Sequence, residues 1–232
     1  MRKSQNAPRS DGDGTRLALI EAAGRLAAER GWADVKAKDV CALAQASTAS
    51  VNYWFGSRDK LYEAVVAEIP QGIVSDTTLQ AMHMAVEGRV SAKTVLESVF
   101  EELLEGAEDP TQWRRRLWTR EMATGPSPAF AQIIEDVGSE RVEVLRTLLA
   151  MYLGTKPTDA ETSEALLSSL STCMMLVVIP EQFRKLLFAD MFGPGVPSRD
   201  ILQRMLMHNL KLKKRSLEKK KKKPRNKDED DE

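Results

Sequence analysis

Residues 46–61 have the sequence ASTASVNYWFGSRDKL, and this stretch decides the fold. Small and polar residues fill its first half, which predicts a slim helix over about 48–54, with Ser47 as its N-cap and Val51 as its inward anchor. A helix end of this kind can enter the major groove of DNA, and the free N–H groups of its first turn can bind a phosphate.

Three further helices are predicted around this one. They are expected at 15–30, 37–44 and 58–69. Gly31 stands where the first of them should end, Ser57 is placed to cap the last, and Pro70 should end it. A second helix that holds a third across a tight turn is the arrangement that major-groove recognition requires. The sequence therefore predicts an N-terminal helix-turn-helix.

Apolar residues at helical spacing continue through the rest of the chain, and no strand pattern interrupts them. Proline and glycine separate the expected helices, which lie near 74–87, 91–106, 110–123, 128–153, 159–179, 181–191 and 199–214. We therefore expect an all-α protein, with a three-helix helix-turn-helix domain followed by a helical bundle for ligand binding and dimerisation. The expected parts are a disordered arm at 1–14, the DNA-binding domain at 15–69, the bundle at 70–212 and a charged, disordered tail at 213–232.

The net charge of zero conceals an uneven distribution. Residues 211–232 hold 11 Lys or Arg and 6 Asp or Glu, so the rest of the chain is mildly acidic. An acidic body argues against DNA binding over the whole surface and confines DNA contact to one small face. We interpret the lysine run as a solvated tail.

Several function classes find no support in the composition. No apolar stretch is long enough to span a membrane, and the polar N-terminus lacks the hydrophobic region of a signal peptide. We therefore expect a cytoplasmic, nucleoid-associated protein with no membrane partner. Cys41, Cys173, His83 and His208 show no metal-ligand spacing, and the two cysteines are expected to be buried, reduced thiols. Because no catalytic or phosphate-binding motif is present, no enzymatic activity and no cofactor are expected.

The N-terminal part also contains a series of short motifs. They are AA at 22–23, LAAERGW at 26–32, KDVC at 38–41, AQAS at 44–47 and NYWFGSRDKL at 52–61. Together they make the segment 15–65 resemble the DNA-binding domain of the TetR family of regulators. Three positions depart from the family pattern: Gln45 replaces the usual glycine of the turn, Lys36 replaces a capping Ser or Thr, and Trp54 replaces a frequent histidine. From the first departure we expect a turn without a left-handed residue.

The resemblance also implies roles for individual residues. Tyr53 is expected to bond a DNA phosphate, unless it is a half-buried aromatic residue that braces the helices. Thr48, Ser50 and Asn52 are candidates for contacts with base edges, and asparagine suits adenine. The lysines either position the protein on phosphates or are solvated surface charges. The candidate DNA-binding residues are Lys36, Lys38, Ser47, Thr48, Ser50, Asn52, Tyr53, Trp54, Arg58 and Lys60.

Two motifs in the second half of the chain restrict the resemblance to one branch of the family. Residues 114–122 have the sequence RRRLWTREM and residues 126–130 the sequence PSPAF. With the segment NYWFGS they are similar to the CecR (or CerR) branch, whose C-terminal domain is a drug-responsive module. Methionine and aromatic side chains suit a promiscuous pocket, although each can equally be ordinary core. The candidate ligand-binding residues are Trp113, Arg116, Trp118, Arg120, Met122, Phe130, Met151, Met174 and Phe183.

The expected partners are double-stranded operator DNA, a small-molecule effector and a second copy of the chain. A pseudo-palindromic operator calls for a twofold dimer with one recognition helix per half-site. Helices 159–179 and 199–212 are the expected interface, although their apolar stripes can also face their own bundle. These stripes contain Leu166, Leu167, Leu170, Met174, Val177, Ile201, Leu202, Met205 and Leu206.

The main hypothesis is a repressor that leaves its operator when a drug or xenobiotic binds. The alternative is a ligand-independent DNA-organising protein, in which the basic tail supplies sequence-independent affinity and the bundle serves only for assembly.

Overall fold

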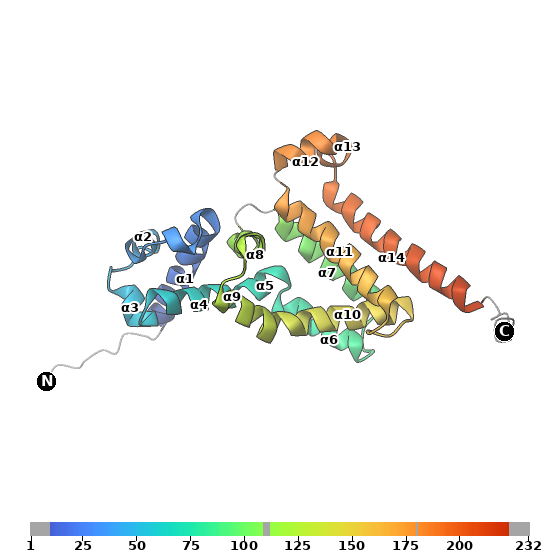
Figure 1. Cartoon of the computed structure of the whole chain (residues 1–232), viewed down its shortest axis with the longest axis horizontal. Helices are drawn as coiled ribbons and strands as arrows, with labels where there is room; N and C mark the ends of the chain where they lie inside the picture. Colours follow the sequence, from blue (N-terminus) through green and yellow to red (C-terminus); the bar gives the residue numbers. More distant parts are fainter. Residues whose placement is uncertain (1–9, 109–111, 180, 223–232) are drawn as a thin grey trace, which may run out of the picture. The chain divides into compact units, whose positions relative to one another are not determined.

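The computed structural model of the chain describes residues 10–108, 112–179 and 181–222. Within these ranges all regular secondary structure is helical and no strand occurs, which confirms the all-α prediction (Figure 1). The helices form two compact units, one made of Met1–Ile73 with Asp109–Ser139 and the other of Val74–Glu108 with Glu140–Glu232. None of the described helices is both long and apolar enough to cross a lipid bilayer.

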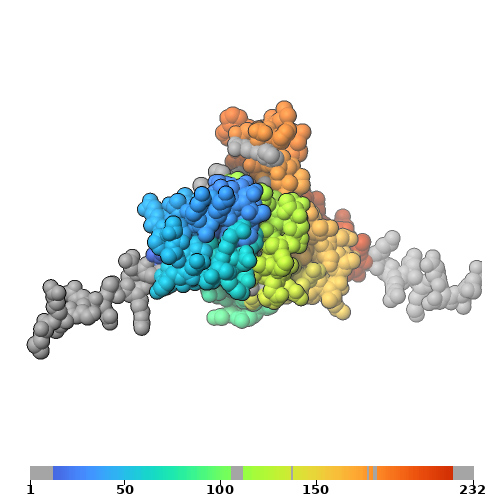
Figure 2. Space-filling model, turned by 60° about the vertical axis from the view of Figure 1, so that its left-hand side comes forward, coloured from blue at the N-terminus to red at the C-terminus, as the bar shows by residue number. Residues whose placement is uncertain are grey.

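The first unit contains the predicted helix-turn-helix together with a later pair of helices. Its elements are α1 (Ser10–Arg30), the short 3-10 helix η1 (Trp32–Asp34), α2 (Ala37–Leu43), α3 (Ser50–Phe55), α4 (Arg58–Ala67), α5 (Ile69–Ile73), α8 (Trp113–Thr124), α9 (Pro128–Ile133) and the π-helical turn η2 (Ile134–Gly138). Helix α8 packs against α1 and α5, and α9 packs against α4. Figure 2 shows the lime-coloured residues of α8 and α9 directly against the blue and cyan N-terminal helices.

A missing side chain allows α8 to approach α1 so closely. A Cβ atom at Gly24 would lie 2.4 Å from the indole ring of Trp113, so glycine leaves the space that this ring fills. The Trp113 Nε1–H group donates a hydrogen bond of 2.7 Å to Glu21. Trp113, Leu117 and Phe130 belong to the same buried cluster as Leu19 and Leu61. The core of the N-terminal helices is thus completed by residues more than forty positions further along the chain.

The second unit is a separate helical bundle arranged around α7. Its elements are α6 (Asp76–Val86), α7 (Ala92–Glu108), α10 (Ser139–Leu153), α11 (Ala160–Val178), α12 (Glu181–Leu187), α13 (Ala189–Phe192) and α14 (Ser198–Lys222). Helix α7 contacts α6, α11 and α14 and presents the fully buried side chains of Leu96, Phe100 and Leu104. The buried Arg141 guanidinium bonds the Val74 carbonyl at 3.1 Å and the Asp76 carboxylate at 2.6 Å.

The helix limits differ from the predicted ones at several places. Helix α1 already begins at Ser10, inside the segment 1–14 that was expected to be a disordered arm; residues 1–9 lie outside the described ranges. The fourth helix ends before Pro70, which lies inside α5 instead of closing α4. The predicted helix at 128–153 is divided by the π-helical turn η2.

A further difference concerns the tail. Helix α14 continues to Lys222, although the disordered tail was expected from residue 213. Leu217 is buried in this extension, which gives the helix an apolar contact that the lysine run alone did not suggest. Residues 223–232 lie outside the described ranges. The predicted division at residue 70 also differs from the two units, because α5, α8 and α9 join the first unit.

Candidate nucleic-acid interface

The turn between α2 and α3 has the geometry that the glycine of the family pattern would give. Gln45 has a φ of 53°, in the left-handed region, so the expectation of a turn without a left-handed residue was wrong. The Ala46 N–H group donates to the Cys41 carbonyl at 2.8 Å, and the Gln45 N–H group donates to the Ala42 carbonyl at 3.3 Å. These two bonds form a Schellman motif in which glutamine occupies the position that glycine prefers.

Helix α3 divides into a buried and an exposed side. Val51 is 2% exposed and anchors the helix, as predicted from its position. Asn52 and Tyr53 point to solvent, and Tyr53 is 78% exposed, so it does not brace the helices. Ser47 does not cap α3 as expected: Ala49 is the N-cap residue, and the Ser47 hydroxyl lies 2.9 Å from the Ser50 hydroxyl.

Most of the ten candidate DNA-binding residues lie on the surface of the first unit. The exposed ones are Lys36, Lys38, Ser47, Thr48, Asn52, Tyr53 and Lys60, and the partly buried ones are Ser50, Trp54 and Arg58. Lys36 is the N-cap residue of α2 and makes no side-chain capping bond. Ser57 caps α4 as predicted, since its hydroxyl accepts the Lys60 N–H group at 3.1 Å.

Arg58 is directed into the protein. Its guanidinium donates to the Trp32 carbonyl and, at 3.4 Å, to the Ala33 carbonyl, and it lies 4.7 Å from the centre of the Trp32 ring. Trp32 also stacks on Tyr62, with ring centres 4.5 Å apart and an interplanar angle of 15°. Among the described residues, neither the Arg58 Nε atom nor the Trp32 Nε1 atom has a hydrogen-bond partner.

Tyr62 connects this stack of side chains to α8 by a hydrogen bond. The Tyr62 hydroxyl donates to the carboxylate of Glu121, which is 8% exposed. The same carboxylate accepts the Ser127 N–H group at 2.7 Å, at the corner between α8 and α9. Burial, followed by the hydrogen bond to Glu121, raises the pKa of Tyr62 above its usual range, so the phenol remains protonated. One carboxylate therefore joins α4, α8 and the start of α9.

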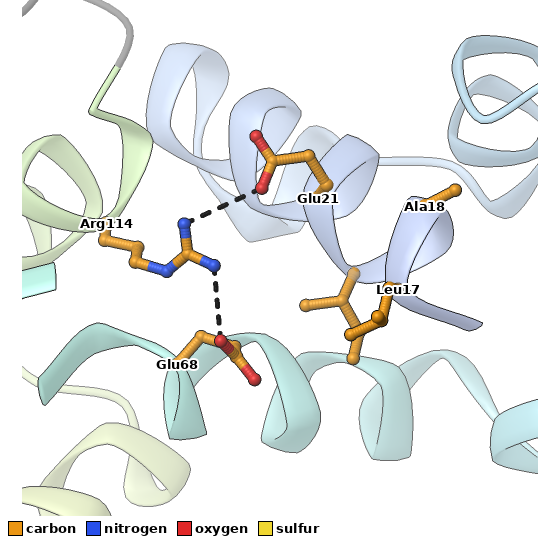
Figure 3. Close-up of a pocket in the computed structure, with 6 residues that line it drawn as sticks. Leu17, Ala18, Glu21, Glu68 and Arg114 are labelled. Carbon is orange, nitrogen blue, oxygen red and sulfur yellow. Dashed lines mark hydrogen bonds and ion pairs between the residues drawn. The ribbon is translucent and has the colours of Figure 1, made fainter. Parts of the chain in front are cut away.

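Three arginines of the RRRLWTREM motif also hold α8 in the first unit. Arg114 lies between Glu21, at 3.7 Å, and Glu68, at 3.2 Å, beside a pocket of about 330 Å³ (Figure 3). Arg115 is buried and donates to the Gly72 carbonyl at 2.8 Å. Arg120 packs on Gly31, where a Cβ atom would lie 2.7 Å from its Nη2 atom. The pocket is lined by Leu17, Ala18, Ile20, Glu21, Glu68 and Arg114.

The nine candidate ligand-binding residues do not belong to a single unit. Trp113, Arg116, Trp118, Arg120, Met122 and Phe130 are in the first unit, and Met151, Met174 and Phe183 are in the second. Trp113 and Phe130 are buried in the core beneath the helix-turn-helix, and Trp118 packs against it. Met122, Met151 and Phe183 are 56%, 44% and 49% exposed. Arg116 is exposed and Met174 is partly buried.

The predicted dimerisation stripes divide in a similar way. Leu166, Leu202 and Leu206 are buried within the second unit and therefore belong to its own core. Leu167, Met175 and Val178 are 70%, 51% and 54% exposed on α11, which leaves an apolar row facing solvent. On α14 Met205 is exposed.

The sequence did not identify Trp32 and Tyr62 as part of the support for the interface. One signal was available, because Arg58 and Tyr62 are four residues apart on α4 and share a face. The pairing of Tyr62 with Glu121 had no such signal, since it joins residues 59 positions apart.

Residues 19–65 match the family model of bacterial regulatory proteins of the tetR family, and residues 92–211 match that of the C-terminal domain of the HTH-type transcriptional dual regulator CecR. No curated protein matches the chain.

Solved structures of transcriptional regulators have the same fold. FadR from Bacillus subtilis in complex with stearoyl-CoA is 13% identical, with a TM-score of 0.58 over 84% of this chain and 96% of its own. A TetR-family regulator from Streptomyces coelicolor is 15% identical, with a TM-score of 0.58 over 88% and 96%. GusR from Salmonella enterica is 21% identical, with a TM-score of 0.56 over 85% and 95%.

Proposed function

Because this chain belongs to the TetR family of bacterial transcriptional regulators, with a CecR-type C-terminal domain, we propose that it is a repressor that a small molecule releases from operator DNA. It binds a pseudo-palindromic operator as a homodimer. The family and the fold are those of transcriptional regulators rather than enzymes.

The observation that carries the proposal is the polar surface of α3 and of the turn before it. Val51 fixes the helix from behind, while Thr48, Asn52 and Tyr53 are exposed around it. Thr48 and Asn52 are the residues we assign to base edges, and the Tyr53 hydroxyl to a backbone phosphate. Lys36, Lys38 and Lys60 add phosphate contacts that position the helix without specifying sequence.

The Arg58 side chain has a different role in this proposal from the one that the family resemblance implied. Its guanidinium is already bound to the Trp32 and Ala33 carbonyls and stacked on an indole ring. We therefore assign Arg58 to the support of α4, in whose first turn it lies. The phosphate contacts are left to Tyr53 and the exposed lysines.

The effector is proposed to be an organic compound such as an antibiotic or another xenobiotic. The CecR-type match covers 92–211, and FadR, which has the same fold, is described in complex with stearoyl-CoA. Of the candidate ligand-binding residues, Met151, Met174 and Phe183 supply adaptable apolar surface in the second unit. Trp113, Trp118 and Phe130 instead pack in the core of the first unit.

Release follows from a shift between two states of the dimer. The operator-binding state holds its two recognition helices about one DNA turn apart, roughly 34 Å. An effector that binds better to a state with another spacing lowers the affinity for the operator, and the operator lowers the affinity for the effector by the same factor.

The test is the binding of the purified full chain to DNA from upstream of its own gene, at near-physiological salt, with random-sequence DNA as competitor. Binding that resists the competitor, that weakens at least tenfold on Asn52→Ala and that one of a set of candidate drugs releases is the expected result. The proposal is contradicted if random-sequence DNA competes for the chain as well as the upstream fragment does and no compound releases the complex. That outcome favours the DNA-organising alternative.

A further inference from the structure

The C-terminal half of α14 is attached to its unit by one face. Leu210 and Leu217 are 3% and 8% exposed. Lys214 lies between these two leucines in the sequence, and its ammonium is 4.9 Å from the centre of the Tyr152 ring. Lys221 follows Leu217, and its ammonium donates a hydrogen bond of 2.5 Å to the Gly154 carbonyl. These residues are three or four positions apart, so they lie along one side of the helix. We call Leu210, Lys214, Leu217 and Lys221 the docked row.

Three cations of the same helix segment lie outside the docked row. Lys211, Arg215 and Lys219 repeat every four residues and are all exposed. Lys211, Arg215 and Lys219 are called the basic row. Residues 211–222 contain eight Lys or Arg residues and one acidic residue, Glu218. The segment is therefore helical up to Lys222, and the basic row presents three ordered cations to solvent.

We propose that the basic row is a second DNA-binding surface, which holds the phosphate backbone without reading its sequence. This function goes beyond operator recognition by α3, because it lies on the second unit and does not depend on base sequence. Its partner is double-stranded DNA, the polyanion that a TetR-family regulator meets whenever its recognition helix is occupied.

The spacing of the basic row fits this partner. Four helical residues span about 6 Å, and a DNA strand carries one phosphate per about 3.4 Å of duplex axis, so each of the three cations can meet a separate phosphate. Because the docked row holds the helix in place, binding does not first have to order the segment. Each phosphate that is neutralised releases counterions, which gives a direct measure of the contacts.

The experiment measures the affinity of the full chain for a random-sequence duplex at several salt concentrations. The variant Lys211→Gln/Arg215→Gln/Lys219→Gln removes the basic row. The matched control Arg89→Gln/Lys93→Gln/Lys156→Gln removes the same charge from exposed positions elsewhere in the second unit. Circular dichroism and light scattering verify that fold and oligomeric state are unchanged in both.

The expected result is a smaller salt dependence in the first variant only. The slope of log K against log salt should become shallower by about 0.9 for each lost phosphate contact, hence by about 2.7 for the three contacts of one protomer. The preference for operator over random DNA should persist, since α3 is intact. If the two variants have equal slopes and equal affinities for random DNA, the basic row does not bind DNA and the proposal is overturned. That outcome leaves the operator test above unaffected.

Discussion

At the scale of single residues, the turn before the recognition helix contains a local strain. Gln45 adopts a φ of 53°, which costs a residue with a Cβ atom about 1–2 kcal/mol. Part of this cost is offset because glycine loses more backbone entropy on folding. We predict that Gln45→Gly raises the free energy of unfolding by about 0.5–1 kcal/mol, as measured by urea denaturation. Gln45→Ala keeps the strain and should show no such gain; equal stability of the two variants would contradict the prediction.

Two glycines of α1 should respond in opposite ways to the same substitution. A Cβ atom at Gly24 would lie 2.4 Å from the Trp113 ring, so Gly24→Ala forces α1 and α8 apart and should cost about 1–3 kcal/mol. Gly14 has no atom within 4 Å of such a Cβ atom. Gly14→Ala should therefore stabilise the helix by up to about 1 kcal/mol. Thermal denaturation of both variants tests the sign, and a Gly24→Ala variant with the Tm of the wild type or a higher one would refute the close packing of Trp113.

At the scale of helices, one buried carboxylate fixes α8 to α4. Tyr62→Phe removes the hydroxyl that donates to Glu121 and should lower the free energy of unfolding by about 1.5–3 kcal/mol at pH 8. Because the pKa of Tyr62 is raised in the folded state, the unfolded chain loses its phenolic proton first, near pH 10. The contribution of Tyr62 to stability is thus complete below pH 10 and is lost as the pH rises further.

Urea denaturation of the wild type and Tyr62→Phe between pH 8 and 11 measures this contribution. The difference between the two proteins should be constant up to pH 9 and should then shrink. Comparing the two chains cancels the titration of the lysines, which both contain. A difference that grows with pH would show that Tyr62 ionises more easily in the folded chain, against the burial that the structure shows.

The helices themselves could largely be predicted from the sequence, whereas their partners could not. Periodicity and punctuation place α11 at 159–179, against an observed Ala160–Val178, because amphipathic spacing and caps are local signals. The packing of α8 on the helix-turn-helix depends on the fit of Trp113 over Gly24, and no local pattern encodes such a fit. For the same reason the candidate DNA surface was predicted at the exposed positions of α3, while the inward direction of Arg58 was missed.

At the scale of the whole molecule, operator binding and dimerisation should be lost together. Leu167 and Val178 are exposed on α11, eleven residues apart and therefore on one side of the helix. Exposed leucine and valine in a row of this kind mark a surface that a partner covers. A single recognition helix reads few base pairs, so a monomer loses most of the affinity that two half-sites provide.

We predict that Leu167→Glu/Val178→Glu converts the dimer into a folded monomer and weakens operator binding by at least a hundredfold. Light scattering gives the mass, circular dichroism verifies the helix content, and titration of the operator duplex gives the affinity. Met84→Glu, on the exposed side of α6, is the control and should remain dimeric. A dimer that persists in the double variant would place the interface on another face of the second unit, and its exposed apolar helix α12 would be the next to test.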